Sequence, residues 1–394
     1  MHSYQEEFHP PERLLLGPGP SNVNPRVLKA MGAPLLGHLD PAFLRVMDDV
    51  KEMLRLVFQT GNIITFPVSG TGSAGIETAM VNVLEAGDTA VVGVNGYFGD
   101  RMAQIAERCG ATVHRVETEW GYPLDPAAVR AELAKHPKVK AVGMIHAETS
   151  TGVLSPVAEI AEIVHAHDAL LIVDAVTSLG GIEVAVDEWG VDICYSGTQK
   201  CLGCPPGLAP VTMSPRAEEV LTTRKTPVQS WYLDLSLLRS YWSNTRAYHH
   251  TAPISMIYGL REGLRVVLEE GLEARYQRHA RNAAGLRAGL EALGLRLFAQ
   301  EDARLNTLTS VRIPEGVSDT NVRGTLLKEH GIEIGGGLGP VAGKAWRIGL
   351  MGENSKPAAV LTLLSALEKI LPQEGYEVAQ GQGVGAAEQK LGEP

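Results

Sequence analysis

The chain has 394 residues, a formal net charge of −10 and the composition of an ordinary globular protein, with 44% hydrophobic and 20% charged residues. No basic cluster interleaved with aromatic residues occurs, which argues against a nucleic-acid partner, and no apolar run approaches the ~20 residues of a membrane span. Four cysteines are too few for a disulfide framework in this length, and the N-terminus lacks a secretory signal, so we expect a cytoplasmic protein.

The first half of the chain predicts an α/β protein. Residues 1–20 are rich in proline and are expected to form an irregular arm. A helix is expected after Asp40, which can cap it, because Pro41 suits a first turn and apolar residues follow on one face. Helical patterns then alternate with short apolar runs typical of buried strands, which predicts a mostly parallel, doubly wound sheet. These runs lie at 62–68, 90–94, 112–117, 140–147, 169–176 and 192–197.

The second half predicts a smaller α/β unit. Residues 220–253 carry few helix or strand signals, and two long amphipathic helices are expected at about 254–270 and 272–293. Strands near 307–313 and 345–351 and a helix at 356–371 follow. We therefore predict an arm (1–20), a large domain (21–262), a small C-terminal domain (263–372) and a tail (373–394) that is disordered because it is polar and rich in glycine.

Residues 70–75, Gly-Thr-Gly-Ser-Ala-Gly, match the G-x-G-x-x-G pattern of dinucleotide-binding proteins. The acidic residue that should end a second strand about 20 residues further on is missing, so a nicotinamide dehydrogenase is a weak interpretation. Glycines together with Thr71 and Ser73 at a helix start offer free N–H groups, hydroxyl donors and a favourable helix dipole. The segment predicts a phosphate site without identifying whose phosphate it holds.

Two later segments identify the phosphate. Asp174 ends an otherwise apolar strand, where a buried carboxylate needs a partner, and Lys200 follows the next strand end into a loop rich in glycine and proline. Such a pair meets the electronic needs of pyridoxal 5′-phosphate (PLP): the lysine binds the aldehyde and moves protons, and the carboxylate keeps the pyridine nitrogen protonated. No metal is predicted, because the C-x-x-C pair Cys201/Cys204 lacks a second ligand pair.

The chain resembles the class V, fold-type I aminotransferases of the alanine–glyoxylate and serine–pyruvate family over about residues 13–371. The strings that carry the resemblance include SGTGSAGIE, VNGYFGDR, ETSTGVLSP, VDAVTSLGG, YSGTQKCLGCPPG, YHHTAP and WRIGLMG. The resemblance implies a large PLP-binding domain with a mostly parallel seven-stranded sheet between helices, and a smaller C-terminal α/β domain. It also implies a homodimer whose active sites are shared between the subunits.

The resemblance further implies a role for each matching residue. Lys200 carries PLP as a Schiff base, Asp174 pairs with the pyridine nitrogen, and Phe98 stacks on the ring. The cofactor phosphate is bound by Thr71, Gly72, Ser73 and Gln199, and from the neighbouring subunit by Tyr248 and Thr251. Thr149 lies near the phenolic oxygen of PLP and near the substrate. Gly19, in the arm, lies near the substrate. Arg347 holds the substrate carboxylate, a role that suits the planar and permanently charged guanidinium.

The expected reaction moves the amino group of a small amino acid, alanine or serine, to glyoxylate, giving pyruvate or hydroxypyruvate and glycine. Some positions depart from the family pattern: animal members have Trp where Phe98 stands and His where Ser73 stands. Relatives that act on ureidoglycine tend to carry Asn in place of Tyr248, which argues against that donor. Aspartate as donor, a class V lyase such as a cysteine desulfurase, and a binding-only role stay open as alternatives.

Overall fold

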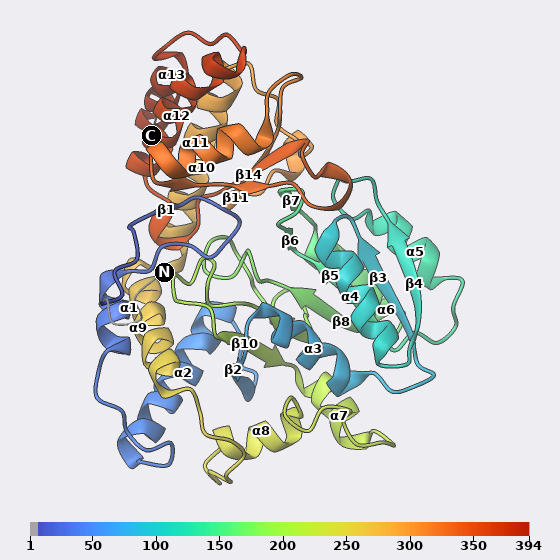
Figure 1. Cartoon of the computed structure of the whole chain (residues 1–394). Coiled ribbons are helices and arrows are strands. Elements are labelled where there is room, and N and C mark those ends of the chain that lie inside the picture. Colours follow the sequence, from blue (N-terminus) through green and yellow to red (C-terminus); the bar gives the residue numbers. More distant parts are fainter. Residues whose placement is uncertain (1–6, 394) are drawn as a thin grey trace.

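The computed structural model describes residues 7–393 of the chain. Its centre is a seven-stranded sheet with the order β2-β10-β9-β8-β5-β3-β4 (Figure 1). β10 is antiparallel to both of its neighbours, and the other strands are parallel to one another. The predicted α/β fold with a mostly parallel seven-stranded sheet is therefore confirmed. The strands are β2 (Ile64–Ser69), β3 (Thr89–Val94), β4 (Thr112–Glu117), β5 (Ala141–Ile145), β8 (Leu170–Asp174), β9 (Ile193–Tyr195) and β10 (Leu208–Met213).

Helices follow most of these strands along the chain. The helix predicted after Asp40 is α2 (Pro41–Phe58), and the Asp40 side chain accepts a hydrogen bond of 2.7 Å from the N–H of Ala42. Its apolar stripe, which includes Phe43 and Met47, is fully buried in the main core. The other helices of this part are α1 (Pro25–Met31), α3 (Gly72–Val83), α4 (Tyr97–Arg108), α5 (Pro126–Leu133), α6 (Val157–Ala166) and α7 (Pro215–Thr223).

Strand β10 was not predicted, because Pro210 lies in the middle of it. Proline lacks an N–H group and is usually confined to edge strands, yet β10 lies between β2 and β9. Pro210 stands opposite Pro67 of β2, and its carbonyl still accepts a hydrogen bond of 2.8 Å from the N–H of Ser196. The region 220–253 likewise contains a helix that was not predicted, α8 (Leu235–Trp242).

A second hydrophobic core lies in the C-terminal part, drawn in orange and red in Figure 1. It is built around Trp346, which is fully buried. The two predicted long helices are α9 (Ile254–Glu270) and α10 (Leu272–Ala292), and α9 runs through the predicted domain boundary at residue 262, which stays a prediction. The remaining elements are β11 (Leu308–Arg312), α11 (Asp319–Glu329), β12 (Ile332–Glu333), β13 (Gly335–Gly336), β14 (Ala345–Gly349) and α12 (Pro357–Ile370), with short β6 (Ala147–Glu148) and β7 (Val153–Leu154) beside the main sheet.

The prediction that residues 373–394 are disordered is wrong for the described part. Helix α13 (Gln382–Gly392) packs against α10, and Ala387 is fully buried in the second core. A glycine of the tail allows this close packing: a Cβ atom added to Gly383 would lie 2.8 Å from the side chain of Leu293 and 3.1 Å from the carbonyl oxygen of Gly289 in α10. The carboxylate of Glu368 accepts hydrogen bonds from N–H groups at the start of the helix, Gly383 among them.

The N-terminal arm is less irregular than expected. Its first six residues lie outside the described range, but β1 (Leu14–Leu15) pairs in parallel with β12, and Leu16 is fully buried in the second core. The segment lies beside the C-terminal part (Figure 1), and its apolar side chains, Leu14 and Leu16, pack against the second core. Between residues 7 and 393, no helix has both the length and the apolar character that crossing a membrane requires.

Candidate functional site

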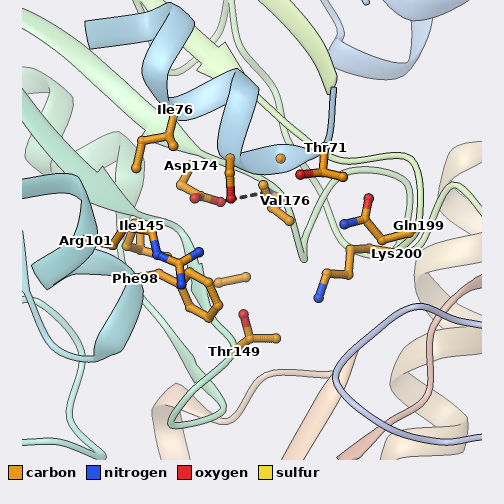
Figure 2. Close-up of a pocket in the computed structure, with 13 residues that line it drawn as sticks. Thr71, Ile76, Phe98, Arg101, Ile145, Thr149, Asp174, Val176, Gln199 and Lys200 are labelled. Atoms are coloured by element: carbon orange, nitrogen blue, oxygen red, sulfur yellow. Dashed lines mark hydrogen bonds between the residues drawn. The ribbon is translucent and has the colours of Figure 1, made fainter. Parts of the chain in front are cut away.

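One cavity collects most of the predicted site residues. Strands β2, β3, β5, β8 and β9 run in the same direction, so the loops after their carboxyl ends meet at one edge of the sheet, where open α/β sheets bind ligands. Figure 2 shows side chains from these loops surrounding the cavity. Those that were predicted are Thr71, Gly72, Ser73, Phe98, Thr149, Asp174, Gln199 and Lys200.

Asp174 is a buried carboxyl group on the wall of the cavity. One of its oxygens accepts a hydrogen bond of 2.7 Å from the hydroxyl of Tyr195, and the other accepts one of 2.8 Å from the N–H of Val176. Burial raises the pKa of Asp174 to about 6, although both hydrogen bonds oppose that rise. A cationic partner in the cavity, such as a protonated pyridine nitrogen, would relieve the cost of keeping this carboxylate ionised.

Asp174 is therefore expected to lower the stability of the cofactor-free chain at neutral pH. Its folded pKa of about 6 lies above the ordinary value of 3.8, so the folded chain loses stability as the pH rises between these values. Stripped of PLP at pH 7.5, Asp174→Asn should be more stable than the unchanged protein by roughly 3 kcal/mol. Thermal unfolding at several pH values measures this gain, which should shrink toward pH 4; a loss of stability at pH 7.5 would contradict it.

Lys200 lies at the opposite side of the cavity from Asp174 (Figure 2), where its side chain is partly buried. Its ammonium donates a hydrogen bond to the carbonyl of Pro18 in the arm. The pKa of Lys200 is lowered to about 8, mainly by burial and to a smaller extent by the positive charge of Arg347. A larger fraction of this amine is therefore neutral near pH 7 than is the case for a surface lysine. Only the neutral amine can attack a carbonyl carbon, so Lys200 is suited to bind an aldehyde.

Gly19 leaves the space that Lys200 occupies. Its φ is +109°, and an added Cβ atom would lie 2.6 Å from both Cδ and Nζ of Lys200. Gly19→Ala should therefore weaken PLP binding and lower activity by roughly 10- to 100-fold, since backbone strain of this kind costs about 1–3 kcal/mol. Titration with PLP, followed by its visible absorbance, measures the binding. Gly37→Ala is the matched control, because no described atom lies within 4 Å of a Cβ there; equal PLP binding by both variants would refute the prediction.

The start of α3 forms an anion site at one end of the cavity. The first N–H groups of the helix, those of Gly72 and Ser73, have no acceptor within the helix, and the Thr71 hydroxyl makes no cap hydrogen bond with the described chain. The side-chain oxygen of Gln199 is buried and has no hydrogen-bond partner among residues 7–393, so this amide is free to turn its NH₂ group toward a ligand. Free donors at a helix N-terminus suit a phosphate group.

Two residues that position Phe98 were not predicted. Arg101 lines the cavity, and its guanidinium carbon lies 5.1 Å from the centroid of the Phe98 ring. The buried carboxylate of Glu148 accepts hydrogen bonds from the N–H groups of Phe98 (3.1 Å) and Gly99 (3.3 Å), so it caps α4 from another loop. The i, i+3 spacing of Phe98 and Arg101 on one helix was the signal that could have identified Arg101.

The remaining predicted residues lie outside the wall of the cavity. Arg347 of β14 is buried next to it: Nε donates to the carbonyl of Gly336 at 2.7 Å, and a terminal nitrogen lies 3.4 Å from the carbonyl of Thr149. Tyr248 and Thr251 are exposed on the surface of the chain, and the side chain of Tyr248 is 63% exposed. A single copy of the chain therefore does not bring Tyr248 or Thr251 to its own cavity.

The residues present fit PLP. The anion site at the start of α3 matches the phosphate, the carboxylate of Asp174 matches the ring nitrogen, and Lys200 supplies the amine. Phe98 adds a flat apolar face on which a ring can stack.

The chain is similar to known proteins over nearly its whole length. The family Aminotransferase class-V matches residues 14–351. The (S)-ureidoglycine–glyoxylate transaminase of Bacillus subtilis is 44% identical over 98% of this chain and 97% of that protein. A crystal structure of ureidoglycine–glyoxylate aminotransferase from the same organism matches with a TM-score of 0.96, at 44% identity over 98% of this chain and all of that one.

Two proteins named for alanine and glyoxylate are similar as well. The alanine–glyoxylate aminotransferase of Callithrix jacchus is 44% identical over 92% of this chain and 88% of that protein. A crystal structure of alanine–glyoxylate aminotransferase from Nostoc sp. matches with a TM-score of 0.92 at 49% identity, over 94% of this chain and 98% of that one.

Proposed function

The chain belongs to the class-V aminotransferase family and uses pyridoxal 5′-phosphate, and we propose that it transfers the amino group of alanine or serine to glyoxylate. The observation that carries the proposal is the meeting of Lys200, Asp174 and the start of α3 in one cavity. The products would be pyruvate or hydroxypyruvate and glycine. Glyoxylate is the acceptor because it is named in both groups of relatives, the alanine–glyoxylate and the ureidoglycine–glyoxylate enzymes.

Each side chain of the proposed site has a separate role in the reaction. Bound in this cavity, PLP supplies an electron sink that makes the α-proton of an amino acid acidic. The carboxylate of Asp174 would accept a hydrogen bond from the protonated ring nitrogen, and Phe98 would support the ring. The Nζ atom of Lys200, whose pKa is lowered to about 8, would take the α-proton of the substrate and return it to the carbon that was the aldehyde of the cofactor. Arg347 binds the substrate carboxylate and thereby orients the bond to that proton.

A panel of donors and acceptors tests this function. The purified holoenzyme is assayed with alanine, serine, aspartate and (S)-ureidoglycine, each with glyoxylate and with pyruvate as acceptor. We expect the highest kcat/KM for alanine or serine with glyoxylate, and parallel lines in double-reciprocal plots, since each half of the reaction releases one product before the next substrate binds. Turnover with aspartate alone, or none with glyoxylate, would overturn the proposal.

(S)-Ureidoglycine is the second candidate donor. It is favoured by the 44% identity to the Bacillus subtilis transaminase, which extends over 98% of this chain. Tyr248 argues against it, as expected from the sequence. If the panel shows turnover with ureidoglycine and glyoxylate only, the glyoxylate half of the proposal stands and the alanine or serine half is wrong.

The cysteines of the chain do not suit a desulfurase. That reaction needs an accessible thiolate, but all four cysteines are buried. Burial raises the pKa of both Cys201 and Cys204, the two nearest to Lys200, to about 12, so both thiols stay protonated at neutral pH.

The transaminase proposal also includes a homodimer, in which the exposed Tyr248 and Thr251 of each subunit would reach the phosphate bound by the other, and a cytoplasmic location.

A further inference from the structure

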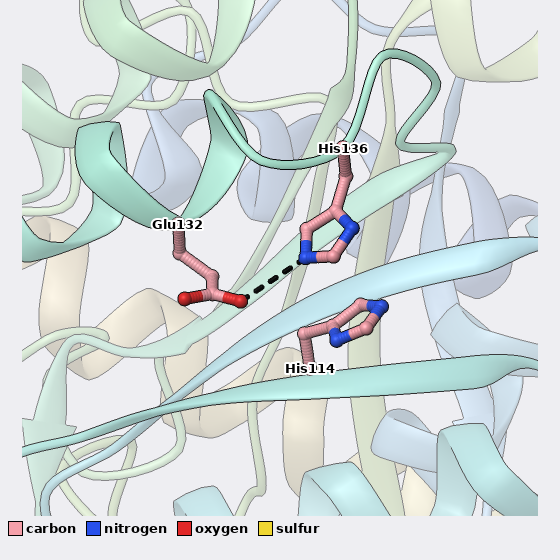
Figure 3. Close-up of side chains that lie close together, drawn as sticks. All are labelled: His114, Glu132 and His136. Carbon is pink, nitrogen blue, oxygen red and sulfur yellow. Dashed lines mark hydrogen bonds and ion pairs between the residues drawn. The ribbon is translucent and has the colours of Figure 1, made fainter.

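Three potential metal ligands lie together at the edge of the main sheet, and none of them lines the cavity. They are His114 on the edge strand β4, Glu132 in the last turn of α5, and His136 just after that helix (Figure 3). One ligand atom from each lies within 4.8 Å of the others. We propose that these residues bind a divalent transition-metal ion of the Zn²⁺ type and so join strand β4 to helix α5.

The chemistry of the three side chains suits such an ion. Two imidazoles and one carboxylate are a known ligand set of zinc, and water completes the tetrahedron in sites with three protein ligands. Glu132 lies in the last turn of α5 and His136 follows just after the helix ends, and their side chains lie side by side (Figure 3). The carboxylate of Glu132 lies 3.1 Å from Nε2 of His136, and their side chains are only 18% and 23% exposed.

The surrounding contacts already fix most of the arrangement. His114 is held by the pairing of β4 with β3, where it stands opposite Val91. The backbone carbonyl of His136 lies 2.8 Å from Nε2 of His167, so this segment is tied to α6. Lys135 forms an ion pair of 2.7 Å with the other oxygen of Glu132, which leaves the oxygen near His136 available.

Metal binding requires a small rearrangement. The two imidazole rings are stacked, with their centroids 3.7 Å apart and an angle of 21° between their planes. Ligand atoms at about 2.0–2.1 Å from a tetrahedral ion are separated by roughly 3.3 Å. The rings must therefore turn so that one nitrogen of each points at the ion.

Titration of the holoenzyme with ZnCl₂ in a non-chelating buffer tests the site, with binding followed by calorimetry and metal content by mass spectrometry. The unchanged protein should bind one ion per chain and unfold at a higher temperature when it is loaded. His114→Ala and Glu132→Gln should each weaken binding by roughly 100-fold or more, because even the loss of an outer partner costs 10- to 100-fold. His330→Ala, a histidine outside the cluster, should bind as the unchanged protein does.

Aminotransferase activity should stay within about twofold in both cluster variants, because the cluster lies outside the cavity that holds the catalytic residues; retained activity also shows that the variants fold. The proposal is overturned if the unchanged protein binds no stoichiometric ion, or if the cluster variants bind Zn²⁺ as tightly as the His330 control. Neither outcome bears on the proposed transamination, which the donor panel tests separately.

Discussion

Lys200→Ala is expected to lower kcat for amino-group transfer by roughly 10⁴-fold or more, because one side chain both binds the cofactor and moves the substrate proton. The position of Lys200 on the cavity wall and its pKa of about 8 support both roles. The visible absorbance of the lysine-bound cofactor should be lost as well. Steady-state kinetics and absorbance spectra measure the two effects.

Added small amines distinguish a loss of proton transfer in the Lys200 variant from a loss of folding. Methylamine or ethylamine can enter the space left by the side chain and should restore part of the proton transfer, which a general folding defect would not allow. Lys29→Ala, at an exposed helix position, is the matched control and should keep full activity. If Lys200→Ala retained more than about a tenth of the activity, another base would have to move the α-proton.

Arg347 provides the second large effect. Arg347→Lys keeps the positive charge but loses the planar pair of donors, and Arg347→Met loses both. Removing one partner of a buried charge pair costs about 2–5 kcal/mol, so kcat/KM for donor and acceptor should fall by roughly 30- to 5,000-fold. PLP should still bind and absorb visible light, because Arg347 makes its contacts with Gly336 and Thr149 beside the cavity and Lys200 is unchanged.

If kcat/KM falls for both the donor and the acceptor, the group that Arg347 binds is the carboxylate. Donor and acceptor have only the carboxylate and its neighbouring carbon in common. Arg312→Lys on β11, where the guanidinium lies over the ring of Phe298, is the control for replacing an arginine in the same small sheet. Unchanged kcat/KM in Arg347→Met would exclude the assigned role.

The parts of the site that were predicted share a physical signal. Asp174 and Lys200 are charged residues at the ends of apolar strands, where burial makes an unpaired charge costly, and parallel strands bring such ends to one edge. Glu148 gave a weaker signal, since it acts through hydrogen bonds to a helix that is distant in sequence, and Arg101 gave only the i, i+3 spacing to Phe98 on the same helix. The role of Tyr195 as a hydrogen-bond donor to Asp174 depends on the register of β8 with β9, which residue types alone do not specify.

The fold was predicted where periodicity and burial agree, as in α2 and in α9, whose bounds match the prediction. It was missed where tertiary contacts override local preference. Proline disfavours a central strand, yet Pro210 lies in one. Glycines suggest disorder in the tail, yet those near α13 allow close packing of helices. Whether Tyr248 and Thr251 complete the phosphate site depends on a second subunit, and a single chain carries no local signal for that contact.

Transfer of an isotopic label tests the central claim most directly. The holoenzyme is incubated with ¹⁵N-alanine or ¹⁵N-serine and glyoxylate, and the products are followed by mass spectrometry. We predict ¹⁵N-glycine, formed in equal amount with pyruvate or hydroxypyruvate and lost in Lys200→Ala. Release of the label as free ammonia, or its absence from glycine with both donors, would contradict the account.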